Sequence, residues 1–411
     1  PVTFGAAGTP IWFGLKNLEA KVEAAIAHPD VLTGFESMAG FNQIIGQWSA
    51  VLHTVMAYIL PLFVVCFLTR FFGANRSWKE GLGVWKFSLM ASTLFVIPFL
   101  VSAFAFGVEF PAVLGGLVGL ALAVVVTRKG LFVPADPWDF APRDSWEQEW
   151  TGEIAAAETI AFTPRMSQFR AWLPYVLIGL ILVLTRIKLF PFQSLVTSLE
   201  LTVNDILGQT QVDYSIQPLY NPGVIPFVLV AVLTVFIHAM RPGQVCTAWV
   251  TALKRMKNPT IALLFAVALV QIFKNSAHNP AELSSMPLVM AEAVAKAAGS
   301  SWPFFAPFVG ALGSFITGSN TVSDLLFADF QYGIASTLDL PHQIIVALQA
   351  VGGAMGNMVC IHNIVAASAT VGLFGVEGLI LKKTVLPLVL YGMVVGTMGL
   401  MFSYVLFPHL F

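Results

Sequence analysis

A short run of hydroxyl, amide and carboxyl side chains near position 320 carries the groups best suited to hold a small anion. The run is Thr317, Gly318, Ser319, Asn320 and Thr321, with Ser323 and Asp324 directly after it. Hydroxyls and an amide can donate to a carboxylate, the glycine allows a turn, and a helix beginning there would aim its N-terminal N–H groups at the same point. The run predicts a binding site for a small organic anion. Its structural alternative is a helix N-cap whose hydroxyls pack against a neighbouring helix.

A second polar cluster lies in 352–363. Its glycines at 352, 353 and 356 allow the chain to unwind or to approach another backbone closely. Asn357, His362 and Asn363 would then line the break. His362 either relays a proton near neutral pH or is a neutral core histidine bonded to a carbonyl, and the sequence leaves both open.

Two carboxylates follow the first run, Asp324 and Asp329. On a continuous helix a spacing of five places them about 140° apart, so they serve different faces. Asp324 is nearer the polar run and is the better candidate for carrying a coupled proton. We expect Asp329 to cap a helix or to pair at an interface.

Composition determines the environment of these groups. Charged residues make up 10% of the chain, hydrophobic residues 57%, and the mean hydropathy is +0.80, whereas soluble domains have roughly a quarter charged residues. Continuous apolar runs exclude the alternation of an outer-membrane barrel, and the net charge of -1 gives no reason to expect a nucleic-acid partner. The three cysteines and seven histidines show no metal-ligand spacing, so no metal and no cofactor is expected. An all-α polytopic membrane protein is predicted.

Spans of about 20 apolar residues are needed to cross a bilayer. Candidate spans are 49–69, 85–107, 110–127, 171–190, 223–240, 259–275 and 384–407. The regions 302–340 and 343–373 are apolar but interrupted, and we expect a re-entrant hairpin and a broken helix there. Polar groups inside the membrane must face a cavity, a ligand or each other, so the chain is interpreted as a transporter.

Lysine and arginine placement predicts the orientation of the spans. Basic residues concentrate in the loops 70–86, 128–170 and 241–257 and at Lys382 and Lys383, which are expected to be cytoplasmic. The loop 191–222 lacks Lys and Arg and is expected outside. The glycine pairs Gly115/Gly119 and Gly392/Gly396 permit close helix contacts, within one protomer or across a homodimer.

The sequence resembles the bacterial L-lactate permease family. The resemblance is carried by GSNTVSDLLF from Gly318, by ALQAVGGAMGNMVCIHNIVAASATVGL from Ala347, and by the opening PVTFGAAGTP. It implies a transporter with inverted repeats and elevator-type movement, similar to the wider ion-transporter superfamily. It also implies proton-coupled uptake of L-lactate, glycolate and related short 2-hydroxy monocarboxylates through the inner membrane.

The resemblance and the pattern together predict one transmembrane transporter domain over 1–411. We expect 1–127 to be the end of a first repeat, 128–170 a cytoplasmic loop and 171–411 a second repeat. The opening residues have no initiator Met and no signal-like segment, so an N-terminal portion is expected to be missing. The predicted partners are the organic anion, a proton and the lipid bilayer.

Two other functions stay open at this stage. A sodium-coupled transporter of another small organic anion would use backbone carbonyls at the same helix breaks. A membrane-embedded enzyme or redox subunit would need a nucleophile with its base, or haem ligation across helices.

Overall fold

The computed structural model describes most of the chain, and almost all of its regular structure is helical. The described residues are 8–28, 33–134, 138–142, 146–147, 166–186, 192–203, 214–220, 225–274, 276, 279–281, 283–284, 286–370, 373 and 375–411. The helices are α1 (Thr9–Trp12), α2 (Glu19–Ala27), α3 (Met38–Phe72), α4 (Trp78–Leu82), α5 (Trp85–Ala105), α6 (Pro111–Arg128), α7 (Gln168–Arg186), α8 (Phe192–Thr197), α9 (Ile225–Ile237), α10 (Pro242–Lys274), α11 (Met286–Ala298), α12 (Trp302–Thr317), α13 (Asn320–Leu338), α14 (His342–Gly356), α15 (Ile361–Thr370) and α16 (Glu377–Met401).

Short irregular elements join these helices. Three 3₁₀ turns are η2 (Lys16–Leu18), η6 (Pro218–Tyr220) and η8 (Gly299–Ser301), and α16 runs on into a π-helical turn, Phe402–Leu406. Two three-residue strands, β1 (Leu201–Val203) and β2 (Tyr214–Ile216), pair antiparallel in the loop after α8. The prediction of an all-α polytopic membrane protein is confirmed, and this small hairpin is an addition in one of its loops.

Within the part of the chain that the structure describes, five helices are long and apolar enough to cross a membrane. They are α3, α5, α6, α7 and α16 with its π-helical turn, and each covers one of the predicted spans. The span predicted at 223–240 is the shorter, 13-residue α9. The span predicted at 259–275 is the second half of a 33-residue helix that begins at Pro242. Proline at the first position of a helix favours its start.

Both predicted interruptions are present. Gly318 ends α12 in the left-handed conformation, with φ of 77°, and Ser319 caps α13, which makes the region 302–340 a helical hairpin. The region 343–373 is divided into α14 and α15 by residues 357–360. Local signals, a glycine and a hydroxyl cap, were sufficient to locate the hairpin turn.

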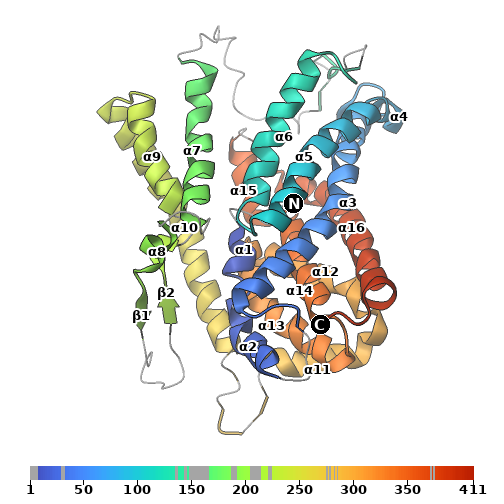
Figure 1. Cartoon of the computed structure of the whole chain (residues 1–411). Helices are drawn as coiled ribbons and strands as arrows, with labels where there is room; N and C mark the ends of the chain where they lie inside the picture. The colour runs from blue at the N-terminus through green and yellow to red at the C-terminus, as the bar shows by residue number, and fades with distance from the viewer. Residues whose placement is uncertain are drawn as a thin grey trace.

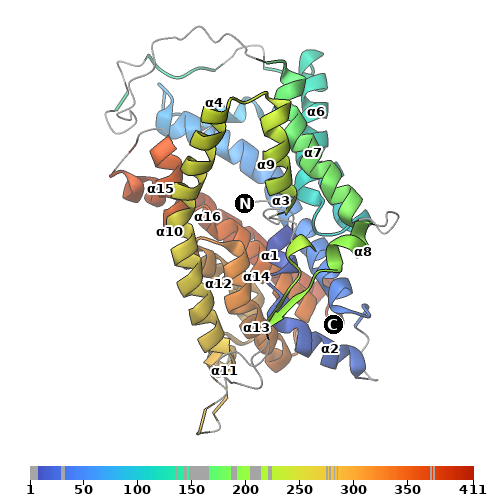
Figure 2. The same ribbon diagram turned by 90° about the vertical axis from the view of Figure 1, so that its left-hand side faces the viewer.

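The hairpin α12–α13 and the helix α14 pack in one bundle with the long spans α3 and α16. Helices α12, α13, α14, α16 and α3 share one hydrophobic core. Helix α5 lies along α3 and α6 packs on α5, whereas α7 to α10 stand at the side of this bundle (Figures 1 and 2). The α12–α14 contact is close: a Cβ at Gly310 would lie 2.4 Å from the Gln349 carbonyl oxygen. Backbones approach at this distance only where side chains are absent.

The glycine pairs noted in the sequence make contacts within the protomer. An added Cβ at Gly115 would lie 3.0 Å from Phe99 Cβ, so the first pair faces α5. An added Cβ at Gly396 would lie 2.4 Å from the Phe304 carbonyl oxygen, so the second pair faces α12. Both pairs are occupied inside one chain, and the homodimer stays a prediction without support from them.

The segment 70–86 and the described start of the loop 128–170 lie at one end of the molecule, the upper end in Figure 1. The predicted loop 241–257 is instead largely the first half of α10, which begins near that end and runs down the molecule. Lys383 Nζ lies 4.3 Å from the centre of the Phe71 ring, and Arg76 pairs with Glu147 of the loop 128–170 at 2.6 Å. The β1–β2 hairpin lies at the opposite end. Arg143 and Arg165 fall outside the described residues.

Candidate functional site

The tip of the α12–α13 hairpin is held by its own hydroxyls. Thr317 Oγ1 donates to the Gly313 carbonyl oxygen at 2.8 Å and Ser319 Oγ accepts from the Val322 N–H at 3.4 Å. Ser323 Oγ donates to the Gly310 carbonyl oxygen at 2.7 Å. Thr317 and Ser323 therefore fix the turn, and the candidate ligands left at the start of α13 are Ser319, Asn320 and Thr321.

Asp324 lies one turn into α13 and is completely buried. Its Oδ1 accepts from Gln349 Nε2 at 3.4 Å. Its Oδ2 has no hydrogen-bond partner, nor has the Oδ1 of Asn320, which is 6% exposed. A buried polar atom without a partner is unusual in a folded protein and marks a place where a ligand, an ion or a proton is expected.

The Asn320 and Asp324 side chains meet at one point on α14. A Cβ added to Gly353 would lie 1.8 Å from Asn320 Oδ1 and 3.4 Å from Asp324 Oδ1, so these two oxygens are no more than 5.2 Å apart. Both atoms accept hydrogen bonds when Asp324 is ionised. A proton on Asp324 would supply the missing donor, and a small cation would satisfy the same oxygens.

A chain of buried amides supports Asp324 from behind. Trp302 Nε1 donates to Gln331 Oε1 at 2.9 Å, and Gln331 Nε2 donates to Gln349 Oε1 at 3.1 Å. The Gln349 amide then donates to Ser323 Oγ at 3.1 Å as well as to Asp324. Each amide is oriented by the one before it, so the N–H that reaches Asp324 is fixed in direction.

The N-terminal segment closes the site from another side. An added Cβ at Gly14 would lie 2.7 Å from Asp324 Cβ and 3.1 Å from the Thr321 carbonyl oxygen. Asn17 Nδ2 donates to the Leu325 carbonyl oxygen at 2.9 Å. The segment between α1 and α2 therefore lies directly against the start of α13.

Two residues of the second predicted cluster lie at the break between α14 and α15. Asn363 Nδ2 donates to both the carbonyl oxygen and the side-chain oxygen of Asn357, each at 3.3 Å. These two residues are thus brought together across the break, and they bond to each other. An added Cβ at Gly356 would lie 2.4 Å from the Ala311 carbonyl oxygen, which places the break beside the middle of α12. The His362 side chain is outside the part of the chain that the structure describes.

Asp329 has the interfacial role expected of it. Its Oδ1 lies 2.7 Å from Lys21 Nζ, and both side chains are partly exposed. The ion pair joins α13 to α2, away from the buried Asp324 carboxyl.

Several residues of the site were not anticipated from the sequence. They are Trp302, Gln331, Gln349, Gly353 as a contact of Asn320, and Gly14. Glutamines inside apolar runs carry a usable signal, because a buried amide requires partners. Among the described residues no group of three or more His, Cys, Asp or Glu side chains could hold a metal ion.

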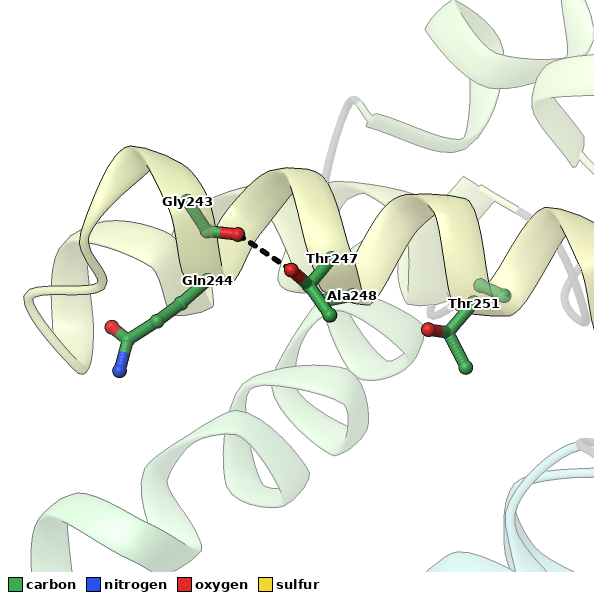
Figure 3. Close-up of a pocket in the computed structure, with 6 residues that line it drawn as sticks. Gly243, Gln244, Thr247, Ala248 and Thr251 are labelled. Atoms are coloured by element: carbon green, nitrogen blue, oxygen red, sulfur yellow. Dashed lines mark hydrogen bonds between the residues drawn. The ribbon is translucent and has the colours of Figure 1, made fainter.

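A surface hollow elsewhere does not coincide with this site. It has a volume of about 630 Å³ and follows one face of α10 (Figure 3). It is lined by Gly243, Gln244, Thr247, Ala248, Thr251 and Ala252. The Thr247 hydroxyl is already bonded to the Gly243 carbonyl oxygen at 2.8 Å. None of these residues belongs to the predicted binding site.

A multi-pass helical bundle that buries unpartnered polar groups at the tip of a broken hairpin defines a membrane transporter. Residues 1–406 match the family model described as L-lactate permease. The chain belongs to this family, and it is a multi-pass protein of the bacterial inner membrane.

Similar proteins come from several bacteria. A Haemophilus influenzae protein also assigned to the L-lactate permeases is 30% identical over all of this chain and 71% of its own length. The L-lactate permease of Bacillus subtilis is 26% identical over 94% of this chain and 66% of its own length. The glycolate permease of Escherichia coli is 24% identical over 98% of this chain and 69% of its own length. The chain therefore spans about two thirds of the length of these relatives, and no solved structure matches it.

Proposed function

We propose that this protein imports L-lactate and related short 2-hydroxy monocarboxylates, glycolate among them, by symport with protons. The observation that carries the proposal is the hairpin tip, where Asn320 and Asp324 are buried with unpartnered oxygens in a chain of the L-lactate permease family. The relatives named as L-lactate and glycolate permeases support the substrate class.

The substrate carboxylate would bind at the start of α13. Free N–H groups at a helix N-terminus attract an anion without a full positive charge, and Ser319, Asn320 and Thr321 stand at that terminus. Gly318 keeps the turn open for the backbone to approach the ligand. Donors fixed in this way would hold both oxygens of a small carboxylate.

The 2-hydroxyl of the substrate would be recognised at the neighbouring break. Asn357 and Asn363 are bonded to each other there, and an amide pair can exchange that bond for one to a hydroxyl. Asn357 is half-buried and Asn363 is exposed, so a ligand without the hydroxyl would leave the two amides bonded to each other and would gain no hydrogen bond from them.

Proton coupling would neutralise the occupied site. Moving an isolated anion through a low-dielectric interior is strongly unfavourable, and a proton bound together with lactate removes that penalty. Asp324 is the principal candidate for the proton carrier because its buried Oδ2 has no partner. His362 is the second candidate.

The domain organisation is part of the same proposal. The site-bearing bundle of α3, α12, α13, α14 and α16 would move relative to α7–α10, which lie at its side. In this proposal 171–411 form the second of two inverted repeats and 1–127 the end of the first. Rigid-body movement of one bundle against another is a common form of alternating access.

Sodium coupling is a second candidate, favoured by one specific observation. The unpartnered atoms at the tip are acceptor oxygens, Asn320 Oδ1 and Asp324 Oδ2, and hard cations prefer oxygen ligands. The proton and sodium versions predict different driving gradients.

Uptake of labelled L-lactate into proteoliposomes tests the proposal. Accumulation is measured under an imposed proton gradient and separately under a sodium gradient, with glycolate, acetate and other organic acids as unlabelled competitors. We expect accumulation with the proton gradient, and glycolate should compete better than acetate, which has no 2-hydroxyl.

The variants Asn320→Ala and Asp324→Asn test the site. Asn320→Ala should weaken binding at least tenfold, because it removes a buried ligand. Asp324→Asn should abolish the pH dependence of uptake. If both variants transported lactate with unchanged affinity and pH dependence, the site would be wrongly placed even if the substrate were right.

A further inference from the structure

A histidine and a tyrosine are bonded to each other inside the bundle, on a different pair of helices from the hairpin tip. His53 lies in the middle of α3 and is 1% exposed, and Tyr391 lies in α16 and is fully buried. His53 Nδ1 is 2.5 Å from Tyr391 Oη, and the two rings meet edge to face with centroids 6.2 Å apart. Both helices are among those able to cross the membrane.

His53 belongs to a polar stripe on α3. Asn42, Ser49 and His53 follow one another at spacings of seven and four, which places them on one helix face. All three are buried, and neither Asn42 Oδ1 nor Ser49 Oγ has a hydrogen-bond partner. The stripe therefore runs from near the start of α3 to the His53–Tyr391 pair.

Burying such a polar stripe inside a membrane protein is energetically unfavourable. Polar and ionisable side chains within spans are rare and mark ion or substrate pathways. A hydrogen bond that only joins two helices in a membrane contributes little stability on average, and apolar residues would pack α3 against α16 without burying an imidazole. Simple helix association therefore does not explain the pair.

The chemistry of the pair suits a proton. Imidazole is the side chain whose charge changes near neutral pH. A tyrosine hydroxyl both donates and accepts, so Tyr391 can donate to neutral His53 Nδ1 and can accept from the same nitrogen once it carries hydrogen. One partner thus satisfies the Nδ1 atom of His53 before and after protonation, without movement of either helix.

The other titratable groups on the helices around α3 lie toward helix ends. On α16, Lys383 lies over the Phe71 and Phe72 rings, eight residues or about 12 Å along the axis from Tyr391. On α5, Lys86 lies over the Trp85 ring at the start of the helix. On α14, His342 is bonded to Ser336 and stacked on Phe411.

Two shorter helices near α3 carry their titratable groups outside the span. On α4, Glu80 accepts from Asn75 and Lys79 lies on the same helix. On α2, Lys21 pairs with Asp329, and Glu19 and Glu23 lie beside it in the sequence. His53 Nδ1 itself is hydrogen-bonded to a titratable side chain, that of Tyr391.

We propose that His53, hydrogen-bonded to Tyr391, is a proton-binding residue of the transport cycle, separate from the hairpin tip. The inference rests on the proposed proton symport. A proton would enter along the Asn42–Ser49 face, bind His53 to give the imidazolium, and leave it as the neutral imidazole, with no other bond formed or broken. In this proposal the hairpin tip binds the substrate and carries the proton site at Asp324, and His53 is a second proton-binding residue that the coupled cycle requires.

The test separates coupling from substrate movement. His53→Gln keeps a side chain that can bond to Tyr391 but cannot take up a proton, and Tyr391→Phe removes one hydroxyl and keeps the ring. Two quantities are measured in proteoliposomes: lactate accumulation driven by a proton gradient, and exchange of labelled for unlabelled lactate at equal pH on both sides.

For His53→Gln we expect exchange within about twofold of the wild type and accumulation at least tenfold lower. For Tyr391→Phe we expect accumulation to persist with its pH dependence shifted. The matched control is His342→Gln, a histidine with a hydroxyl partner outside the pair, for which both quantities should be unchanged.

Lactate accumulation by the wild type separates the proposed proton symport from the role of His53. If the wild type accumulates no lactate with protons, the proposed function itself fails. If the wild type accumulates lactate and His53→Gln does so equally with the same pH dependence, His53 is not a coupling residue. If both variants fold but lose lactate exchange as well as lactate accumulation, the pair has a structural role, and the inference is overturned.

Discussion

Because Gly353 has no side chain, the Asn320 side chain reaches the surface of α14. The hairpin tip contacts the broken helix through this Asn320 side chain. The built Cβ position at Gly353 is only 1.8 Å from Asn320 Oδ1, which is far inside van der Waals contact. Real Cβ atoms do not come this close to an oxygen, so any side chain at 353 must displace Asn320. The absence of one methyl group thus decides the geometry of the site.

The substitution Gly353→Ala should therefore abolish or strongly reduce lactate uptake. Alanine is favoured over glycine inside a helix by roughly 0.5–1 kcal/mol, so helix content should be retained while Asn320 is displaced. Uptake in proteoliposomes and circular dichroism measure the two effects. Gly378→Ala in α16 is the control, because nothing lies within 4 Å of a Cβ built there. Normal uptake by Gly353→Ala would contradict the assignment of Asn320 to the site.

At the residue scale the sequence predicted the polar groups but not their partners. Ser319, Asn320 and Asp324 were identified because polar residues are conspicuous in an apolar chain. Gln349 was not, although it donates to Asp324 across 25 positions, because no local pattern links a glutamine to a carboxylate on the preceding helix. The predicted hydroxyls Thr317 and Ser323 are bonded to backbone carbonyls, which depends on the exact turn of the chain.

At the scale of elements, the segment from α1 to α2 follows α13 along its length. Gly14 is close to Asp324, Asn17 bonds to the Leu325 carbonyl oxygen, and Lys21 pairs with Asp329. The contact between Gly14 and Asp324 is buried, whereas the ion pair between Lys21 and Asp329 is partly exposed. The contribution to the site is therefore expected to fall from the tip of the hairpin toward its base.

Asp329→Asn should change transport little. The Lys21 side chain is 42% exposed and that of Asp329 is 21% exposed, and ion pairs of this kind contribute about 0–1 kcal/mol because solvent screens them. We expect uptake and its pH dependence to match the wild type, with a small decrease in thermal stability. Asp324→Asn, measured in parallel, should lose its pH dependence. Equal effects of the two variants would mean that Asp329 also belongs to the coupling machinery.

At the scale of the whole molecule, the basic loops lie at one end and the β1–β2 hairpin at the other (Figure 1). Lysine and arginine in short loops are retained on the cytoplasmic side. The residue Leu131 follows α6 at the basic end, and Thr202 lies in β1. Both side chains are exposed, so each can report the side on which it lies.

Cysteine labelling tests this orientation. In a background with Cys66, Cys246 and Cys360 replaced, we expect Thr202→Cys to react with a membrane-impermeant maleimide added to intact cells. Leu131→Cys should react only after the membrane is permeabilised, and the cysteine-free protein, which is the control, should not react. The reverse pattern would require the opposite orientation and an outward position for the loop 128–170.

The sequence by itself determined the class of protein, most of the spans, the two helix breaks and the polar run at the hairpin tip. These features depend on composition and on neighbours within a few turns, and such signals are local. The tertiary structure decided which polar groups meet: Gln349 with Asp324, Lys21 with Asp329, and His53 with Tyr391 across 338 positions. These pairs form because helices distant in the chain pack through a shared core, and that packing leaves no trace in the spacing of either partner.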